Sequence, residues 1–173
     1  IELKPPQNLI EKIKFLPRLF EISHYPPKVT TGKAPCHEVI LTDNEIDLFK
    51  FPILKCWPLD GGRFITLPVV FTKSLNNGKR NVGMYRMQVY DKKTTGMHWH
   101  IHKDGASHYD EYKKAGKRME VAVAIGTDPV VTYSATAPLP YGVDELLFAG
   151  MIRKKGVELV KCKTIDMEVP ATA

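Results

Sequence analysis

The sequence predicts a mixed α+β domain built on an antiparallel sheet or barrel. Two observations favour this fold: β-rich runs separated by turn residues fill residues 53–102, and helical patterns then alternate with short strands. A third observation is that 43% of the 173 residues are hydrophobic and 25% are charged, which is typical of a globular protein with a buried core.

The first fifty residues predict a helical and irregular segment that leads into a domain over residues 51–173. Asn8 is positioned to cap a helix over residues 9–21, and Pro17 is expected to kink or break it. The apolar stripe of that helix would be Leu9, Ile13, Leu16 and Phe20. The Pro- and Gly-containing stretch "ISHYPPKVTTGKAPCHEV" predicts a connector, and "TDNEIDLFKFP" predicts a capped helical turn.

Three runs, "RFITLPVVFTK", "NVGMYRMQVYD" and "GMHWHIH", predict a three-stranded antiparallel meander. Asn77-Gly78 is a strong signal for the first hairpin turn. A four-residue loop, "KKTT", would close the second hairpin and bring Arg86 beside Ile101 or His102. Arg86 would then lie on a polar strand face, where a buried guanidinium needs an acidic or phosphate partner.

Helical patterns and strands alternate in the second half of the chain. Ser107 is a candidate cap for a helix that Gly116 stops, and "MEVAVAIGTD" predicts a buried strand. Asp128-Pro129 predicts the start of another helix, and a short helix is expected around residues 144–149. The stretch "GVELVKCKTIDMEVPA" returns to strands.

Three histidines, His98, His100 and His102, alternate in "GMHWHIH", so a strand would place them on one face. Alternate strand residues lie roughly 6.6 Å apart, whereas metal-bound imidazole nitrogens lie about 2 Å from the ion. Two neighbours could share an ion, but all three could not easily do so. Either the histidines simply occupy a half-exposed strand, or further ligands come from elsewhere in the chain.

Composition argues against several other classes of protein. The net charge is +6, but Lys and Arg are dispersed and form no basic stripe interleaved with aromatics, so we expect no nucleic-acid binding. No apolar run is long enough to span a membrane, and the first residues lack the apolar region of a signal peptide. The three scattered cysteines, Cys36, Cys56 and Cys162, favour a reducing compartment, so the cytoplasm is the expected location.

Several motifs in a fixed order carry a resemblance to a known family. "PLDGGRFITLPVVFTK", "GKRNVGMYRMQVYDKKTTGMHWHIHKDGA", "ATAPLPYGVDELLFAGMI" and "VELVKCKTIDMEVPA" closely resemble the central part of the UbiD-type decarboxylases, which use prenylated FMN. The resemblance runs from about residue 51 to the C-terminus. It implies a flavin-binding middle domain with a split-barrel-like core of the FMN-binding type and flanking helices.

The resemblance implies a divalent-metal site that holds the flavin phosphate. Its ligands would be Asn81 of an N-x-x-x-x-R motif, His102 before a basic residue, and Glu145 of "PLPYGVDEL". An imidazole with amide and carboxylate oxygens suits Mn²⁺ or Mg²⁺ better than Zn²⁺. On this interpretation His102 is a ligand, whereas no such role is implied for His98 and His100.

The same resemblance assigns further cofactor contacts. Arg86 would be the catalytic arginine at the reacting face of the flavin, where it pairs with a glutamate and holds the substrate carboxylate. The backbone of Val82, Gly83, Met84 and Tyr85 would cradle the cofactor, and Gly83 would allow its close approach. "SATAPLP" resembles the loop that binds a potassium ion near the phosphate, which implicates Ser134, Ala135 and Ala137. Ala137 and Pro138 of the same loop would also contact the cofactor.

The chain also departs from the family pattern, because the segment with the acidic catalytic residues and the C-terminal domain that would follow "VPA" are absent from it. The implied activity is removal or addition of carboxylate on an aromatic or conjugated acid, of the 4-hydroxybenzoate type or a menaquinone or ubiquinone precursor. A flavin- or metal-binding module without catalysis of its own is the alternative. The resemblance further implies a homo-oligomer, a flavin prenyltransferase that supplies the cofactor, and plain FMN as the other possible ligand.

Overall fold

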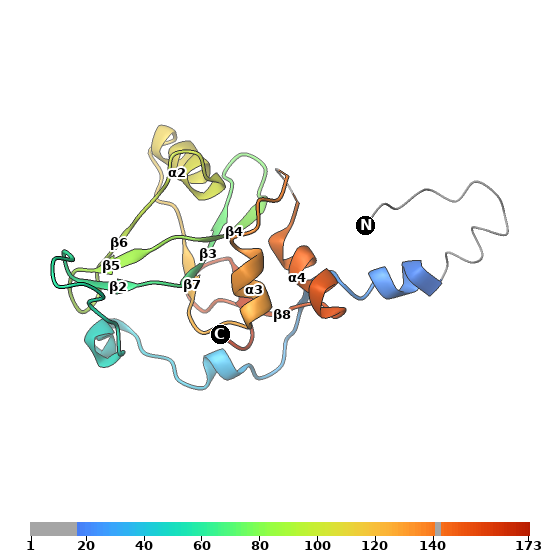
Figure 1. The fold of residues 1–173 in the computed structure, drawn as a ribbon, viewed down its shortest axis with the longest axis horizontal. Helices are drawn as coiled ribbons and strands as arrows, with labels where there is room; N and C mark the ends of the chain where they lie inside the picture. Colours follow the sequence, from blue (N-terminus) through green and yellow to red (C-terminus); the bar gives the residue numbers. More distant parts are fainter. Residues whose placement is uncertain (1–16, 141–142) are drawn as a thin grey trace.

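The structure is a computed structural model that describes residues 17–140 and 143–173, and it contains three three-stranded sheets and the helices named below (Figure 1). The strands are β1 (Lys28–Val29), β2 (Arg63–Ile65), β3 (Val69–Lys73), β4 (Arg80–Met84), β5 (Met87–Val89), β6 (Thr95–Met97), β7 (Ala122–Ala124), β8 (Glu158–Lys161) and β9 (Glu168–Pro170). The helices are α2 (Asp104–Lys114), α3 (Pro129–Ser134) and α4 (Glu145–Arg153), and short 3₁₀ turns cover Pro35–His37, Asp43–Glu45 and Leu48–Lys50.

The sheet β4–β3–β7 is the centre of the fold, with β3 paired antiparallel to both neighbours. Val69 and Phe71 on one face of β3 join Val131 of α3 and Leu146 of α4 in the main apolar core. Thr72 points to the opposite face, where the His108 side chain of α2 contacts it. Helices therefore cover both faces, which explains why the first four residues of β3 are all buried.

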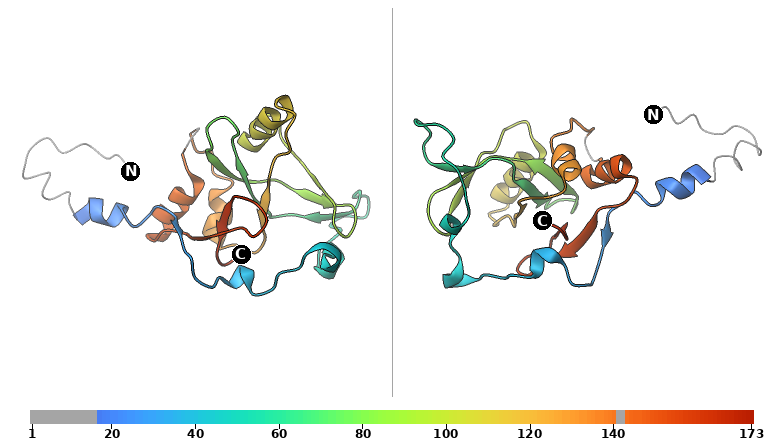
Figure 2. Two further views of the ribbon diagram at one scale, coloured as in Figure 1. Left: turned by 180° about the vertical axis from the view of Figure 1, so that it is seen from behind. Right: turned by 60° about the horizontal axis from the view of Figure 1, so that its bottom comes forward.

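The other two sheets flank this centre. The sheet β2–β5–β6 is fully antiparallel, whereas β8 pairs in parallel with β1 and antiparallel with β9. Figure 2 shows β1 beside β8, although the two are far apart in the sequence. The close approach needs glycine: a Cβ on Gly150 would lie 1.9 Å from the carbonyl oxygen of Tyr25, and one on Gly156 would lie 2.2 Å from that of Pro26.

The expected mixed α+β class is confirmed, but a split barrel is not. The strands of the described residues form separate sheets that do not close into a barrel. The predicted strand "RFITLPVVFTK" is in fact two strands, β2 and β3, separated by residues 66–68. Pro68 explains part of the break because it has no N–H to donate to a ladder. The division of the chain near residue 50 stays a prediction.

A one-residue mismatch separates the central sheet from the β2–β5–β6 sheet. Ile65 pairs with Met87, and Val69 pairs with Met84, so three residues (66–68) face only two (85–86) across the gap. An extra residue on one chain bends the pair and interrupts its hydrogen bonds, as in a β-bulge. The continuous meander that we expected is therefore split into two sheets.

The second hairpin forms, but its register differs from the expected one. Asp91 accepts hydrogen bonds from the backbone N–H groups of Lys93 and Thr94, and this turn lets Thr95 enter β6 opposite Val89. The N–H of His98 consequently donates to the carbonyl of Arg86. The prediction that Arg86 lies beside Ile101 or His102 was wrong.

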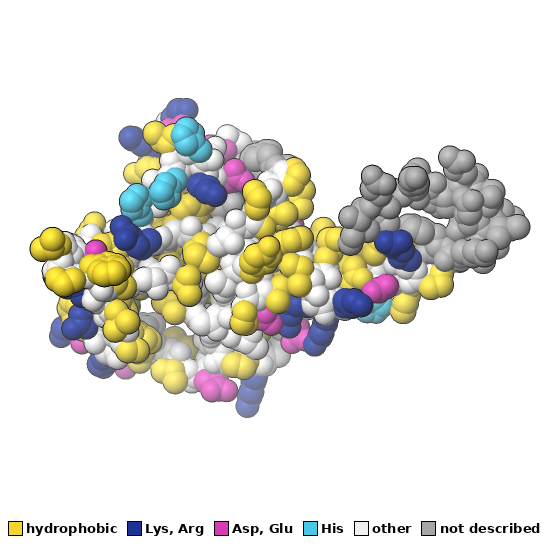
Figure 3. Space-filling model, in the orientation of Figure 1, with side chains coloured by type: hydrophobic (Ala, Val, Ile, Leu, Met, Phe, Trp, Pro, Cys, Tyr) yellow, Lys and Arg dark blue, Asp and Glu magenta, His cyan; other side chains and the backbone are white. Residues whose placement is uncertain are grey.

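The expected histidine strand was also wrong, because β6 ends at Met97. The rings of His98 and His100 stack on each other, with centroids 4.8 Å apart, while Trp99 turns the other way and contacts the Tyr85 ring. His102 lies in a turn just before α2. Figure 3 shows histidine side chains gathered on the surface next to α2.

The helix boundaries predicted from capping residues agree with the structure better than the predicted strand register does. Asp128 and Asp144 cap α3 and α4 with their side chains, and Gly116 follows α2 with a φ of +65°. The Ser107 cap was wrong, because α2 begins at Asp104 and its N-cap residue is Lys103. A helix is present over residues 17–22, whereas the expected cap Asn8 and the stripe residues Leu9, Ile13 and Leu16 lie outside the described residues.

Truncation of the buried Phe71 tests the central position of β3. The Phe71→Ala variant removes a side chain with 0% exposure and should lower the free energy of unfolding by about 3–5 kcal/mol. Leu59→Ala, at a side chain that is 99% exposed, is the control and should change it by no more than about 0.5 kcal/mol. Urea denaturation measures both, and equal effects would contradict the assigned core.

Candidate functional site

A cavity of about 320 Å³ lies along the free edge of β4. It is lined by residues from β4 and the residue after it, from the start of α2, from the loop after α3, and from the start of α4. These residues are Asn81, Val82, Gly83, Met84, Tyr85, His102, Lys103, Asp104, Ala135, Thr136, Ala137, Pro138, Leu139, Pro140 and Glu145. Of the residues predicted to bind the cofactor or its ions, all except Arg86 and Ser134 therefore line one cavity.

The outer edge of β4 supplies backbone groups to this cavity, because β4 is paired only with β3. The N–H of Val82 points outward and donates to the Glu145 carboxylate at 3.2 Å. Backbone direction alternates along an antiparallel strand, so the N–H of Met84 points to the same side as that of Val82. The strand edge therefore offers a hydrogen-bond donor beside the cavity.

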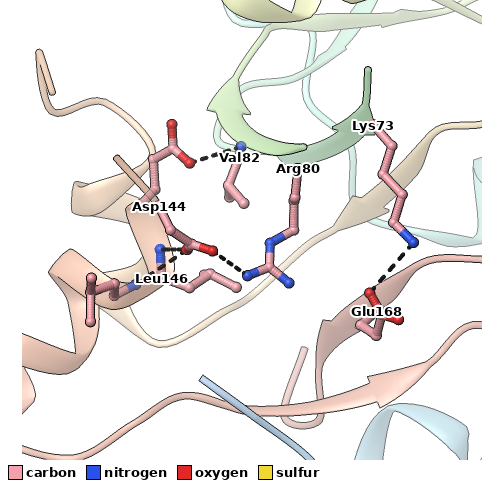
Figure 4. Close-up of polar contacts among 8 residues, drawn as sticks. Lys73, Arg80, Val82, Asp144, Leu146 and Glu168 are labelled. Atoms are coloured by element: carbon pink, nitrogen blue, oxygen red, sulfur yellow. Dashed lines mark hydrogen bonds and ion pairs between the residues drawn. The ribbon is translucent and has the colours of Figure 1, made fainter. Parts of the chain in front are cut away.

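Helix α4 is anchored to β4 at its first turn (Figure 4). The Asp144 carboxylate accepts from the N–H groups of Leu146 and Leu147, and it also pairs with the Arg80 guanidinium at 2.5 Å. The neighbouring Glu145 carboxylate accepts from Val82. These contacts fix the position of the Glu145 carboxylate at the cavity.

Burial raises the pKa of Glu145 to about 7, although hydrogen bonds from its own backbone N–H and from that of Val82 act in the opposite direction. Asp144 and Asp104 add a smaller contribution of the same sign as burial. A carboxylate in such surroundings gains strongly from a nearby cation, which would favour its charged form. Glu145 is therefore suited to hold a positive ion.

On the face of β4 that turns away from the main apolar core, Asn81 belongs to a cluster of buried polar side chains. Its amide NH₂ donates to the Thr72 hydroxyl at 3.4 Å, and this hydroxyl lies 2.9 Å from Nδ1 of His108. All three side chains are buried. Since the amide nitrogen is directed at Thr72, the amide oxygen is the atom left for the cavity.

The segment before α2 brings His102 and Lys103 to the cavity. The first turn of α2 is held by Tyr85, whose hydroxyl accepts from the N–H of Gly105 at 3.1 Å. The N-terminus of an α-helix and a lysine together favour an anion at this end of the cavity. The structure gives a different reason for glycine at position 83: its Cβ would lie 2.5 Å from the Tyr85 ring.

The loop after α3 forms the facing wall of the cavity, with Ala135, Ala137 and Pro138 lining it. Ser134 does not line it. Its hydroxyl donates to the carbonyl of Val130, and its own carbonyl accepts from the N–H of Ala137. Of the residues predicted to bind potassium, Ala135 and Ala137 are therefore the two with access to the cavity.

Arg86 lies outside the main cavity, in a second hollow of about 420 Å³ that Phe64, Gln88, Tyr90, Met97, His98 and Trp99 also line. Its side chain is exposed, and its guanidinium carbon lies 4.4 Å from the centroid of the Phe64 ring. Among the described residues no carboxylate pairs with it. Arg80, whose side chain is 17% exposed, does pair with an acid, Asp144.

The donor set fits a hard divalent cation. Within residues 17–140 and 143–173 no group of three or more His, Cys, Asp and Glu side chains could hold a metal ion. The cavity instead combines the carboxylates of Glu145 and Asp104 with one imidazole and one amide oxygen, and such an oxygen-rich set suits Mn²⁺ or Mg²⁺ rather than Zn²⁺. Sequence patterns had not singled out Thr72, Lys103, Asp104 or His108; the Lys-Asp pair directly after His102 was the available signal for two of them.

Comparison with known proteins decides the family. The description of the matching family is "3-octaprenyl-4-hydroxybenzoate carboxy-lyase Rift-related domain", and the match covers residues 27–173. The chain belongs to the UbiD family. An uncharacterised protein of Archaeoglobus fulgidus is 53% identical to it over 169 residues, which are 97% of this chain and 34% of that protein.

Solved structures of UbiD-class enzymes share the fold. HmfF from Pelotomaculum thermopropionicum, in complex with FMN, aligns with a TM-score of 0.80 and 32% identity over 90% of this chain and 36% of that enzyme. An evolved dimeric form of HmfF is in complex with prFMN. Vanillic acid decarboxylase from Sedimentibacter hydroxybenzoicus gives a TM-score of 0.81 with 28% identity, covering 96% of this chain and 36% of that one. The UbiD chain thus spans about a third of the length of these relatives.

The described part of the UbiD chain includes no helix of the length and apolar character that crossing a membrane requires.

A glutamine at position 145 tests the electrostatics of the cavity in metal-free protein. Because the pKa of Glu145 is raised from 4.5 to about 7, its stabilising contribution is complete below pH 4.5 and is lost as the pH rises to about 7. Glu145→Gln should therefore match the unchanged chain at pH 5 and exceed it at pH 8. Allowing for the part of the side chain in contact with water, we expect a gain in Tm of roughly 3 °C.

Thermal denaturation in EDTA between pH 5 and pH 8 measures this difference. Glu38→Gln, at an exposed carboxylate, is the control. A Tm difference for Glu145→Gln that does not grow with pH would contradict the expectation.

Proposed function

We propose that this UbiD chain is the cofactor-binding part of a non-oxidative (de)carboxylase, and that the β4-edge cavity holds the phosphate end of prenylated FMN through a divalent cation. The observation that carries the proposal is the partly buried carboxylate of Glu145, with a pKa of about 7, in one cavity with Asn81 and His102. Plain FMN is the other candidate ligand. Both cofactors share the phosphate that the cavity would bind.

Asn81, His102 and Glu145 would hold the cation, with Mn²⁺ or Mg²⁺ as the candidates. Three protein ligands leave positions for phosphate oxygens and water around an ion that prefers about six ligands. The cation would balance the negative charge that Glu145 and a phosphate bring into one small cavity. The proposal therefore couples metal binding to flavin binding.

The remaining cavity residues would contact the cofactor itself. The start of α2, the Lys103 side chain and the outward N–H of Met84 offer donors to phosphate oxygens. Ala135 and Ala137 would supply carbonyl oxygens to a potassium ion, and Pro138 would shape the same wall. The backbone from Val82 to Tyr85 would lie along the cofactor.

The size of the cavity limits how much of the cofactor it can hold. Ligand sites usually measure about 300–1,000 Å³, so the 320 Å³ of the main cavity is at the low end. We infer that the flavin ring extends past β4 toward the second hollow, where Arg86 lies. This arrangement would put phosphate and substrate at opposite ends of the cofactor.

Arg86 would bind the substrate carboxylate in that second hollow. A guanidinium presents two parallel N–H groups to a carboxylate, and contact with the Phe64 ring limits the directions that it can take. The prenylated flavin supplies the electron sink that makes loss of carbon dioxide possible. Aromatic and conjugated carboxylic acids are the proposed substrates, including 4-hydroxybenzoate-type acids and menaquinone or ubiquinone precursors.

A second candidate function is a flavin- and metal-binding module that catalyses nothing by itself. The observation that favours it is that Arg86 is exposed and forms no ion pair with a carboxylate among the described residues. The general acid that returns a proton to the substrate would then come from outside this chain. Homo-oligomerisation, a prenyltransferase that supplies the cofactor and a cytoplasmic location stay predictions.

Cofactor retention tests the proposed function. Protein purified with Mn²⁺ and FMN should show a flavin absorption band and release a molecule of the mass of FMN, or of its prenylated form when that is supplied. His102→Ala and Glu145→Gln should each reduce metal-dependent flavin retention roughly tenfold or more. His100→Ala is the matched control, because its ring stacks on His98 and does not line the main cavity.

Flavin content equal to that of the unchanged chain in both ligand variants would overturn the proposed metal site. Carbon dioxide release from 4-hydroxybenzoate by the purified chain with added cofactor would decide against the module without catalysis.

A further inference from the structure

Three buried polar side chains form a chain of contacts that ends at the cavity. His108 on α2 is 4% exposed, Thr72 on β3 is 0% exposed, and Asn81 on β4 is 6% exposed. The Thr72 hydroxyl oxygen lies 2.9 Å from His108 Nδ1 and accepts from the Asn81 NH₂ group at 3.4 Å. Of the three, only Asn81 lines the cavity.

The Thr72 hydroxyl has a single proton, and this proton determines the direction of the hydrogen bond between Thr72 and His108. Because the hydroxyl oxygen accepts from Asn81, its proton is free to be donated to Nδ1 of His108. That bond needs a lone pair on Nδ1, so the imidazole carries its one proton on Nε2. Burial lowers the pKa of His108, against the opposing influence of Glu111 and Asp104, and this favours the neutral ring.

The reverse direction would change what Asn81 presents to the cavity. A proton on Nδ1 would be donated to Thr72, and the hydroxyl proton of Thr72 would then no longer have His108 as its acceptor. Among the three side chains only the Asn81 amide oxygen could then accept that proton, and to do so the amide would turn its oxygen to Thr72 and its NH₂ group to the cavity. An NH₂ group cannot coordinate a cation, whereas an amide oxygen can.

The Tyr85 hydroxyl supports the first arrangement. Burial raises the pKa of Tyr85, while the N–H of Gly105 and the Asn81 amide act in the opposite direction, as hydrogen-bond donors to the phenol oxygen do. The NH₂ group is thus the end of the Asn81 amide that faces the Thr72 and Tyr85 hydroxyls. Its own oxygen is left on the cavity side.

We propose that Thr72 and His108 are positioning residues that hold the Asn81 amide oxygen toward the cavity, ready to bind a divalent cation. The inference rests on the proposed function, since it assigns the orientation of one ligand of the proposed metal site. Neither residue touches the cation in this arrangement. They act through Asn81 alone.

Mn²⁺ titration of the full chain tests the proposal, with the electron paramagnetic resonance signal of free aqueous Mn²⁺ as the readout. Thr72→Val keeps the shape of the side chain but removes the hydroxyl, and it should weaken Mn²⁺ binding roughly tenfold or more. Thr72→Ser restores a hydroxyl and should bind within about twofold of the unchanged chain. Thr132→Val, which removes a hydroxyl from the Thr127–Thr132 contact, is the control and should bind Mn²⁺ normally.

A pair of variants at His108 gives an independent test, which also applies if Thr72→Val does not fold. His108→Asn keeps an acceptor near the Nδ1 position and should retain Mn²⁺ binding, whereas His108→Leu removes the acceptor and should weaken it. Thermal denaturation in EDTA shows whether each variant is folded. A purely structural role would lower Tm without changing the Mn²⁺ affinity of the folded protein.

The outcomes separate this inference from the function on which it rests. If the unchanged chain binds Mn²⁺ and both Thr72→Val and His108→Leu bind it equally well, the positioning role is wrong while the metal site stands. If the unchanged chain does not bind Mn²⁺, the metal site and the positioning role are both wrong. Loss in the two removing variants with recovery in the Ser and Asn variants supports the proposal.

Discussion

The attachment of α4 to the edge of β4 is the contact on which the candidate site depends. Arg80 and Val82, two residues apart on the outer edge of one strand, contact Asp144 and Glu145, which begin the helix. The Asp144 side chain also caps the helix, so one carboxylate both starts α4 and ties it to the sheet. Lys73 makes a comparable link from β3 to Glu168 of β9 at 3.7 Å.

This attachment explains why the acidic side chain of Glu145 remains in a partly buried position. The start of α4 leaves little freedom to Glu145, because Leu146 behind it is fully buried in the main core. Packing of an apolar residue thus holds the neighbouring carboxylate in a place where its charge is costly. Ionisable side chains held in surroundings that disfavour their charge are frequent at binding sites.

Sequence reasoning succeeded where the signal is local and failed where it depends on pairing between distant residues. Asp128 and Asp144 were identified as helix starts because a cap acts within one turn. The register of β5 and β6 was missed because a tight turn at Asp91 sets it. A buried arginine was expected to need an acidic partner, and this was applied to Arg86; Arg86 is exposed, whereas the partly buried Arg80 on β4 has such a partner.

The candidate site itself could not be found from local patterns. Asn81, His102 and Glu145 are separated by 21 and 43 positions, and only the resemblance to a family grouped them before the structure did. Thr72 and His108 gave no signal at all, because the burial of a polar side chain is a property of the assembled fold. Only the structure shows that these residues lie behind Asn81.

The uneven gap between the two sheets makes the length of one short segment matter more than its composition. Between Ile65 and Val69 the chain has one residue more than it has between Met84 and Met87. Deletion of one residue there would equalise the two sides and allow the ladders to join into one long ribbon. Arg86 would then continue the line of β4, and the main cavity and the second hollow would no longer lie beside two separate sheets. Relatives should therefore tolerate exchanges within residues 66–68 more readily than losses.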